Sequence, residues 1–103
     1  MDTLGVQPSL QSRLRPFPNG ATAMAEMARA GLPGAIGCTQ VTEILYTDGV
    51  ELVAVLPPQF ELATMYTAAV ATGAREPELA AQLLDLLSGA AQQALRTAGG
   101  FEP

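Results

Sequence analysis

The chain has 103 residues and a mass of 10.7 kDa, which suffices for one small domain burying about 60 to 65% of its unfolded surface and excludes a second full lobe. Hydrophobic residues make up 49% of the chain and charged residues 15%, with a mean hydropathy of +0.24, so the composition predicts a folded chain and excludes disorder. Five arginines, no lysine and ten carboxylates give a net charge of -5, which argues against nucleic acid and anionic membrane surfaces as partners.

The residue types also restrict the chemistry. The chain has no histidine and one cysteine, Cys38. This composition excludes disulfides within the chain, the usual zinc ligand sets and catalytic pairs of serine or cysteine with histidine. No phosphate-loop, dinucleotide or metal motif is present, so we predict neither an enzyme nor a cofactor.

In the first half, the pattern predicts two helices. Residues 8–14 begin with Pro8, a favourable first helical residue, and place two leucines four positions apart. A second helix starts after Asn19, a strong N-cap residue, and ends at the run 31–34. Its apolar residues recur at helical spacing: Ala21, Met24, Ala25 and Ala28.

The middle of the chain predicts strands. Residues 35–40 have the pattern of a short buried strand, Val41 to Leu45 that of a helical turn, and Asp48-Gly49 that of a turn. Residues 50–56 are apolar apart from one glutamate, as in a strand covered on both faces. Residues 62–71 are rich in β-branched and aromatic residues, which favours another strand.

The last third predicts two amphipathic helices. The first begins at Glu76-Pro77 and has one apolar stripe that should face a core, formed by Leu79, Leu83, Leu86 and Leu87. Ser88 is a candidate cap for the final helix, which Gly99-Gly100 closes. The alternation of strands and helices predicts an α/β fold with a mixed sheet flanked by helices.

The best candidate site is the loop that leads into the second helix, formed by Asn19, Gly20, Ala21 and Thr22. Backbone N–H groups at a helix start have no partner within the helix and attract anions. In the alternative interpretation, Asn19 and Thr22 only cap the helix.

The second candidate is Thr39-Gln40, at the end of a predicted strand, where α/β folds commonly meet ligands. The neighbouring Cys38 is interpreted as a small buried apolar residue, since no basic group stands by to activate its thiol. Glu43 could act as a catalytic carboxylate or simply lie on the surface. Tyr66 is expected to be half-buried in a strand, with its hydroxyl at the edge.

The order of these segments resembles a known family. The runs AIGCTQVTEIL (35–45) and GVELVAVLP (49–57), with the ending LLSGAAQQALRTAGGFEP (86–103), are similar to the C-terminal half of the molybdate-type periplasmic solute-binding proteins of ABC transporters. The resemblance covers residues 14–103. It implies part of a type II periplasmic-binding-protein lobe, with residues 1–103 as a single domain whose first lobe is absent.

The resemblance also implies a site and partners. In the molybdate-binding members, a backbone N–H at a helix start and a hydroxyl after the next strand hold the solute, and these places fall at Ala21 or Thr22 and at Gln40. The family's usual residue at the latter position is tyrosine, and an amide there widens the possible ligands because it both donates and accepts. The implied partners are a small oxyanion such as molybdate, bound weakly or not at all by this part alone, and a transporter permease.

The resemblance places the family in the periplasm. Met1 to Leu4 lack the basic start of a signal peptide and no apolar run reaches the ~20 residues of a membrane span, so the chain as written is expected in the cytoplasm. An apolar stripe without a covering lobe predicts a homo-oligomer. The alternative is a cytoplasmic ligand-sensing or oligomerisation module of the same fold, without a transport role.

Overall fold

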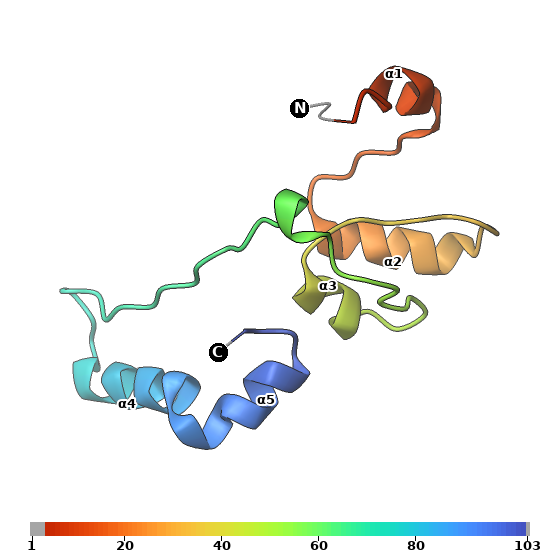
Figure 1. The fold of residues 1–103 in the computed structure, drawn as a ribbon. Coiled ribbons are helices and arrows are strands. Elements are labelled where there is room, and N and C mark those ends of the chain that lie inside the picture. The colour runs from red at the N-terminus through yellow and green to blue at the C-terminus, as the bar shows by residue number, and fades with distance from the viewer. Residues whose placement is uncertain (1–3, 103) are drawn as a thin grey trace.

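Helices joined by extended segments make up the computed structural model, which describes residues 4–102 (Figure 1). The α-helices are α1 (Gln7–Leu10), α2 (Gly20–Ala30), α3 (Val41–Tyr46), α4 (Pro77–Ser88) and α5 (Gln93–Ala98). Single turns of 3-10 helix cover Gln11–Arg13, Pro58–Phe60 and Ala90–Gln92. The helices predicted after Pro8, Asn19, Gln40 and Glu76 are therefore confirmed.

Helix α2 has well-defined ends because its flanking residues satisfy the backbone there. Asn19 is extended, with φ -156°, and its side chain accepts a hydrogen bond of 2.8 Å from the Thr22 N–H. At the other end Gly31 adopts φ +54°, and its N–H donates to the Met27 carbonyl at 3.2 Å. Glycine adopts this left-handed backbone conformation without strain, so a glycine at position 31 ends the helix.

The small core lies where α2 packs against α3 and the loop between them. Met24 is the one buried side chain among the described residues, with 2% of its surface exposed. A side chain on Gly37 would collide with the Met24 thioether, and a Cβ on Gly49 would lie 3.2 Å from the Ala28 Cβ. Small residues therefore let two loops approach α2 closely.

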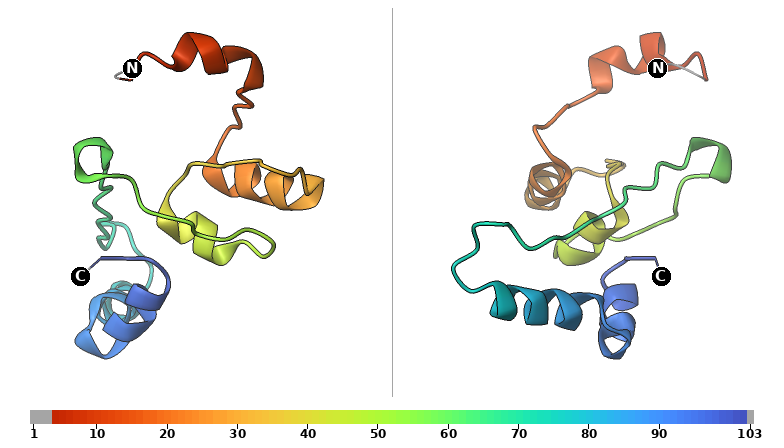
Figure 2. Two further views of the ribbon diagram at one scale, coloured as in Figure 1. Left: turned by 45° about the vertical axis from the view of Figure 1, so that its right-hand side comes forward. Right: turned by 90° about the vertical axis from the view of Figure 1, so that its left-hand side faces the viewer.

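The C-terminal half forms an open arm, residues 61–98, that leads away from this core. Its extended segment 61–71 runs out to a turn, and α4 returns beneath it in the opposite direction (Figures 1 and 2). Arg96 of α5 holds the end of α4 by donating to the carbonyls of Leu87 and Gly89, at 2.7 and 2.9 Å.

The molecule is long for its size. Its principal extents are 53 × 29 × 26 Å and its radius of gyration is 17.9 Å, whereas a compact chain of this length has a radius of about 13 Å. Both ends contribute to the elongation, since α1 stands apart from α2 at one end and the arm leads away from α2 and α3 at the other.

The predicted mixed sheet is wrong: no strand or sheet occurs among residues 4–102. Residues 35–40, 50–56 and 62–71 are irregular and carry no ladder of hydrogen bonds. Val53, expected to be covered, is 92% exposed. The residue pattern favours an extended backbone, but a sheet also needs a neighbouring segment to pair with, and the described chain provides none.

Two further expectations on helices need correction. Ser88 does not cap the final helix; it is the last residue of α4, and its hydroxyl donates to the Leu84 carbonyl at 2.7 Å. The leucine stripe of α4 does not face a core, since its four members are 53 to 59% exposed.

The expectation about a signal peptide rests largely on Met1 to Thr3, which lie outside the described residues, as does Pro103. None of the helices described has both the length and the hydropathy needed to cross a bilayer.

Candidate functional site

The start of α2 meets the start of α3, which brings together two segments nearly twenty residues apart. A Cβ on Gly20 would lie 2.6 Å from the Cβ of Thr39 and would overlap the Thr39 hydroxyl and the Glu43 carboxylate. Glycine is therefore required at position 20 for this approach. The Thr39 hydroxyl donates to the Glu43 carboxylate across the first turn of α3.

Gln40 ties the site to the arm. Its amide nitrogen donates to the Thr64 hydroxyl at 3.2 Å, and its amide oxygen accepts from the Tyr66 hydroxyl at 2.8 Å. The Tyr66 ring also meets Phe101 edge to face, with centroids 5.7 Å apart. Three distant parts of the chain thus converge beside α3.

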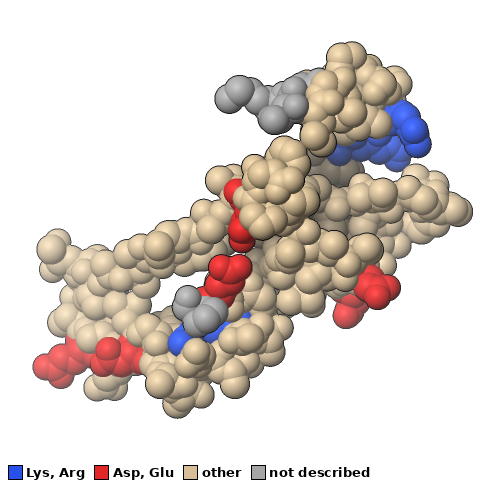
Figure 3. Space-filling model, viewed as in Figure 1, with Lys and Arg blue, Asp and Glu red and all other residues tan. Residues whose placement is uncertain are grey.

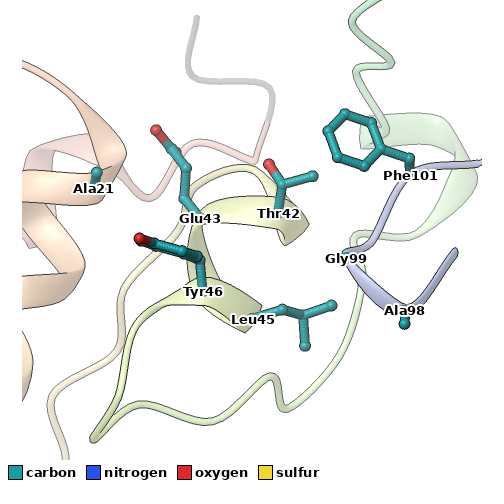
Figure 4. Close-up of a pocket in the computed structure, with 8 residues that line it drawn as sticks. All are labelled: Ala21, Thr42, Glu43, Leu45, Tyr46, Ala98, Gly99 and Phe101. Atoms are coloured by element: carbon teal, nitrogen blue, oxygen red, sulfur yellow. The ribbon is translucent and has the colours of Figure 1, made fainter. Parts of the chain in front are cut away.

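An open groove of about 400 Å³ adjoins this cluster. Figure 4 shows it between Ala21 of α2, the residues of α3 and the C-terminal segment that follows α5. Glu43 and Tyr46 extend toward the α2 side, and Leu45 extends toward Gly99. The full lining consists of Ala21, Thr42, Glu43, Leu45, Tyr46, Ala98, Gly99 and Phe101.

The six residues predicted as the binding site come from two segments, 19–22 and 39–40. Asn19 and Thr22 bond to each other as a helix cap, which the sequence left open as the alternative to a ligand role. The N–H groups of Gly20 and Ala21, by contrast, have no hydrogen-bond acceptor within the described chain. Thr39 and Gln40 immediately precede α3, and Thr39 lies against Gly20. The two candidate segments are therefore adjacent in space.

Glu43 gives the cluster at the starts of α2 and α3 its negative charge. It lies in the first turn of α3, where the partial positive charge of the helix start stabilises a carboxylate, and it also lies beside the start of α2. The described residues contain one ion pair, between Glu26 and Arg29 on α2, so no arginine neutralises Glu43. That pair lowers the pKa of Glu26, first through the hydrogen bond from Arg29 and then through its charge.

Sequence reasoning missed Thr64 and Tyr66 as neighbours of Gln40. Tyr66 is 62% exposed and lies outside any strand, so its expected place as a half-buried strand residue is wrong. Residues two apart in an extended chain point to the same side. The Thr-x-Tyr spacing therefore indicated that these two side chains share one side of the segment, but not that Gln40 lies opposite them.

Cys38 is exposed, contrary to the interpretation as a buried apolar residue. Within residues 4–102 no group of three or more potential metal ligands comes together. The polar atoms of the cluster are hydroxyls, amides and one carboxylate, which suit hydrogen bonding to a small polar solute.

Comparison with protein families gives a match to the model described as bacterial extracellular solute-binding protein, over residues 1–102. The chain belongs to this family. Membership shows a substrate-binding role in transport, and the family's proteins are extracellular. Searches of curated proteins and of solved structures gave no match.

For a solute-binding protein, the polar cluster next to an open groove is the natural place to look for the solute. The family match identifies neither molybdate nor any other ligand. It supports the coarser part of the resemblance seen in the sequence, a solute-binding protein.

Proposed function

We propose that this chain supplies one side of the binding site for a small oxyanion, such as molybdate, in the solute-binding component of an ABC transporter. In this proposal residues 1–103 are the C-terminal part of a two-lobe protein that works in the periplasm with a membrane permease. The supporting observation is that Gly20, whose N–H is unpaired at the start of α2, lies against the Thr39 side chain.

These donors suit an oxyanion because they are neutral and fixed in place. Helix α2 has eleven residues, which is long enough for its N-terminus to carry the partial positive charge of a helix dipole. The close approach at Gly20 keeps Thr39 next to that turn. Gln40 is held by Thr64 and Tyr66 and presents an amide in the same region.

Glu43 has to be accounted for, because its carboxylate already lies where the oxyanion would bind. Two negative charges about 4 Å apart repel by ~1 kcal/mol even in bulk water and by more near a protein surface. An entering oxyanion must therefore displace the Glu43 side chain and take over the hydrogen bond from Thr39.

The same carboxylate supports a second candidate, a solute that carries hydrogen-bond donors or a positive charge. Glu43 would then accept from the solute, together with the Gln40 amide oxygen. The two candidates make opposite predictions for Glu43→Gln, which removes the charge and preserves the shape of the side chain.

The test is a titration of the amide NMR spectrum of the 103-residue chain with molybdate, tungstate, sulfate and phosphate at constant ionic strength. NMR detects even millimolar dissociation constants, which suits a site that has only one wall. We expect one oxyanion to shift the Gly20, Ala21 and Thr39 amide signals selectively. Glu43→Gln should tighten that binding about tenfold, and Thr39→Val should weaken it.

Thr72→Val is the matched control for Thr39→Val, because it makes the same change at an exposed position in the turn at the far end of the extended segment. Equal effects of the two variants, or no selective shift with any oxyanion, would contradict the oxyanion proposal. Weaker binding of an amine-bearing solute in Glu43→Gln would favour the second candidate.

A further inference from the structure

Asn19 is the only asparagine in the chain, and a glycine follows it. The backbone nitrogen of the residue after an asparagine can attack the side-chain amide, and glycine hinders this attack least because it has no side chain. The close contact with Thr39 requires glycine at position 20. The fold therefore keeps a reactive Asn-Gly pair at the candidate site.

Three features of the start of α2 favour the attack on the Asn19 amide. Asn19 is exposed, so water can reach its side chain. The Gly20 N–H has no hydrogen-bond acceptor within the described chain, so the attacking nitrogen is not held by another bond. The Thr22 N–H donates to Asn19 Oδ1 at 2.8 Å, and a donor at this oxygen stabilises the negative charge that develops there when the carbonyl is attacked.

The reaction exchanges the amide for a carboxylate and consumes only water. The Gly20 nitrogen forms a bond to Asn19 Cγ and loses its proton, the bond from Cγ to the side-chain nitrogen breaks, and ammonia leaves. A cyclic imide remains. Water then opens the ring at Cγ to give aspartate, or at the backbone carbonyl to give isoaspartate. No electrons are transferred, and the new carboxyl group loses its proton to solvent at neutral pH.

We propose that Asn19 is a site of spontaneous deamidation, and that the product closes the candidate site to oxyanions. Either product adds one negative charge to a chain whose net charge is -5. The charge is added next to Gly20, against which the Glu43 carboxylate already lies. Most of the face viewed in Figure 3 is neutral, and its charged atoms lie in a few separate groups, so one more carboxylate changes the local charge substantially.

The aspartate product preserves the helix while it changes the charge of the site. Aspartate caps a helix about as well as asparagine does, and its charge interacts favourably with the helix dipole. Helix α2 should therefore keep its start at Gly20. An oxyanion would then meet two carboxylates, and its binding would weaken through like-charge repulsion. This effect on binding rests on the proposed function, whereas the deamidation itself does not.

The first test is chemical and uses the folded natural chain at neutral pH. Samples taken at intervals are digested with trypsin, which cleaves after Arg13 and Arg29 but not before Pro16, and are analysed by mass spectrometry. Peptide 14–29 contains Asn19 as its only side-chain amide. We expect its mass to rise by the difference between an NH2 and an OH group, with isoaspartate among the products.

The free peptide 14–29, kept under the same conditions, is the reference for the effect of the fold. A folded chain that stays unmodified while the free peptide deamidates would show that the start of α2 protects Asn19, and would overturn the proposal. A rise in mass in the folded chain supports it.

The second test compares Asn19→Asp with Asn19→Ser, because both residues cap a helix and only aspartate carries a charge. Thermal unfolding should give the two variants similar midpoints. In the oxyanion titration Asn19→Asp should bind about tenfold more weakly than Asn19→Ser, and equal binding would overturn the closing of the site. If no variant binds any oxyanion, the proposed function fails together with the effect on binding, whereas the mass of peptide 14–29 still decides whether Asn19 deamidates.

Discussion

The α2–α3 region and the arm contain similar proportions of apolar residues but bury them very differently. Around α2, glycines at positions 20, 37 and 49 allow loops to approach, and Met24 is enclosed. On the arm, the four leucines of the α4 stripe have only an extended segment above them and stay more than half exposed. The comparison teaches that close backbone approach, rather than apolar content, decides where this chain forms a core.

The largest effect is expected where the core is. Met24→Ala should lower the free energy of unfolding by about 2 kcal/mol or more, since it removes a fully buried side chain and leaves a cavity. Urea unfolding followed by circular dichroism measures this. Leu95→Ala in α5, where the leucine is 73% exposed, should change stability by less than about 0.5 kcal/mol. Equal losses would mean that the two regions do not differ as described.

The next largest effect on stability is expected at the contact between Gly20 and Thr39. Gly20→Ala places a methyl group within the space of the Thr39 side chain and should cost about 1 to 3 kcal/mol. It should also abolish oxyanion-induced shifts of the Thr39 amide signal. Gly73→Ala is a fitting control, because nothing lies near a Cβ there; a Gly20→Ala protein of natural stability would show that the two segments are not held together.

The helix ends of the two regions also differ in how much they contribute to stability. Asn19→Ala removes the hydrogen bond to the Thr22 N–H and should destabilise the protein by about 1 kcal/mol. Ser88→Ala, at the end of α4, removes only a hydroxyl bond to a helical carbonyl and should be close to neutral. Thermal unfolding of both variants at one concentration compares them, and a larger loss in Ser88→Ala would reverse our ranking.

The smallest effect is electrostatic. Arg29 holds the pKa of Glu26 below its usual value of about 4.5, so the pair stabilises the folded state above that pH and loses this contribution as the pH falls through the lowered pKa. Both groups are at the surface, and the effect should be slight and weakened by salt. Glu26→Gln should remove this part of the acid dependence; an unchanged profile would show that the pair adds nothing.

Local signals predicted the helices well because their causes are local. Asn19, Gly31 and Pro77 define helix ends through their own backbone preferences, and no distant residue is needed. The predicted sheet was wrong because strand pairing is not determined locally. Residues 62–71 do adopt a non-helical backbone, but pairing depends on a second segment that the sequence pattern cannot specify.

The candidate site was partly predictable. The helix start at Gly20 and the polar pair Thr39-Gln40 were each visible as signals, and the structure brings them together. The role of Glu43 beside Gly20 could not be foreseen, because it depends on how two helices pack. The contact between Gln40 and Tyr66 spans 26 residues, beyond what helical or strand spacing can show.

The exposed thiol of Cys38 has a practical consequence. It is the only cysteine in the chain, it is accessible, and it stands next to Thr39. A maleimide fluorophore would therefore attach at one position, directly beside the candidate site, without any engineered residue. Its emission would report the entry of a solute or the displacement of Glu43 in real time. Cys38 is thus a natural labelling position for a binding assay.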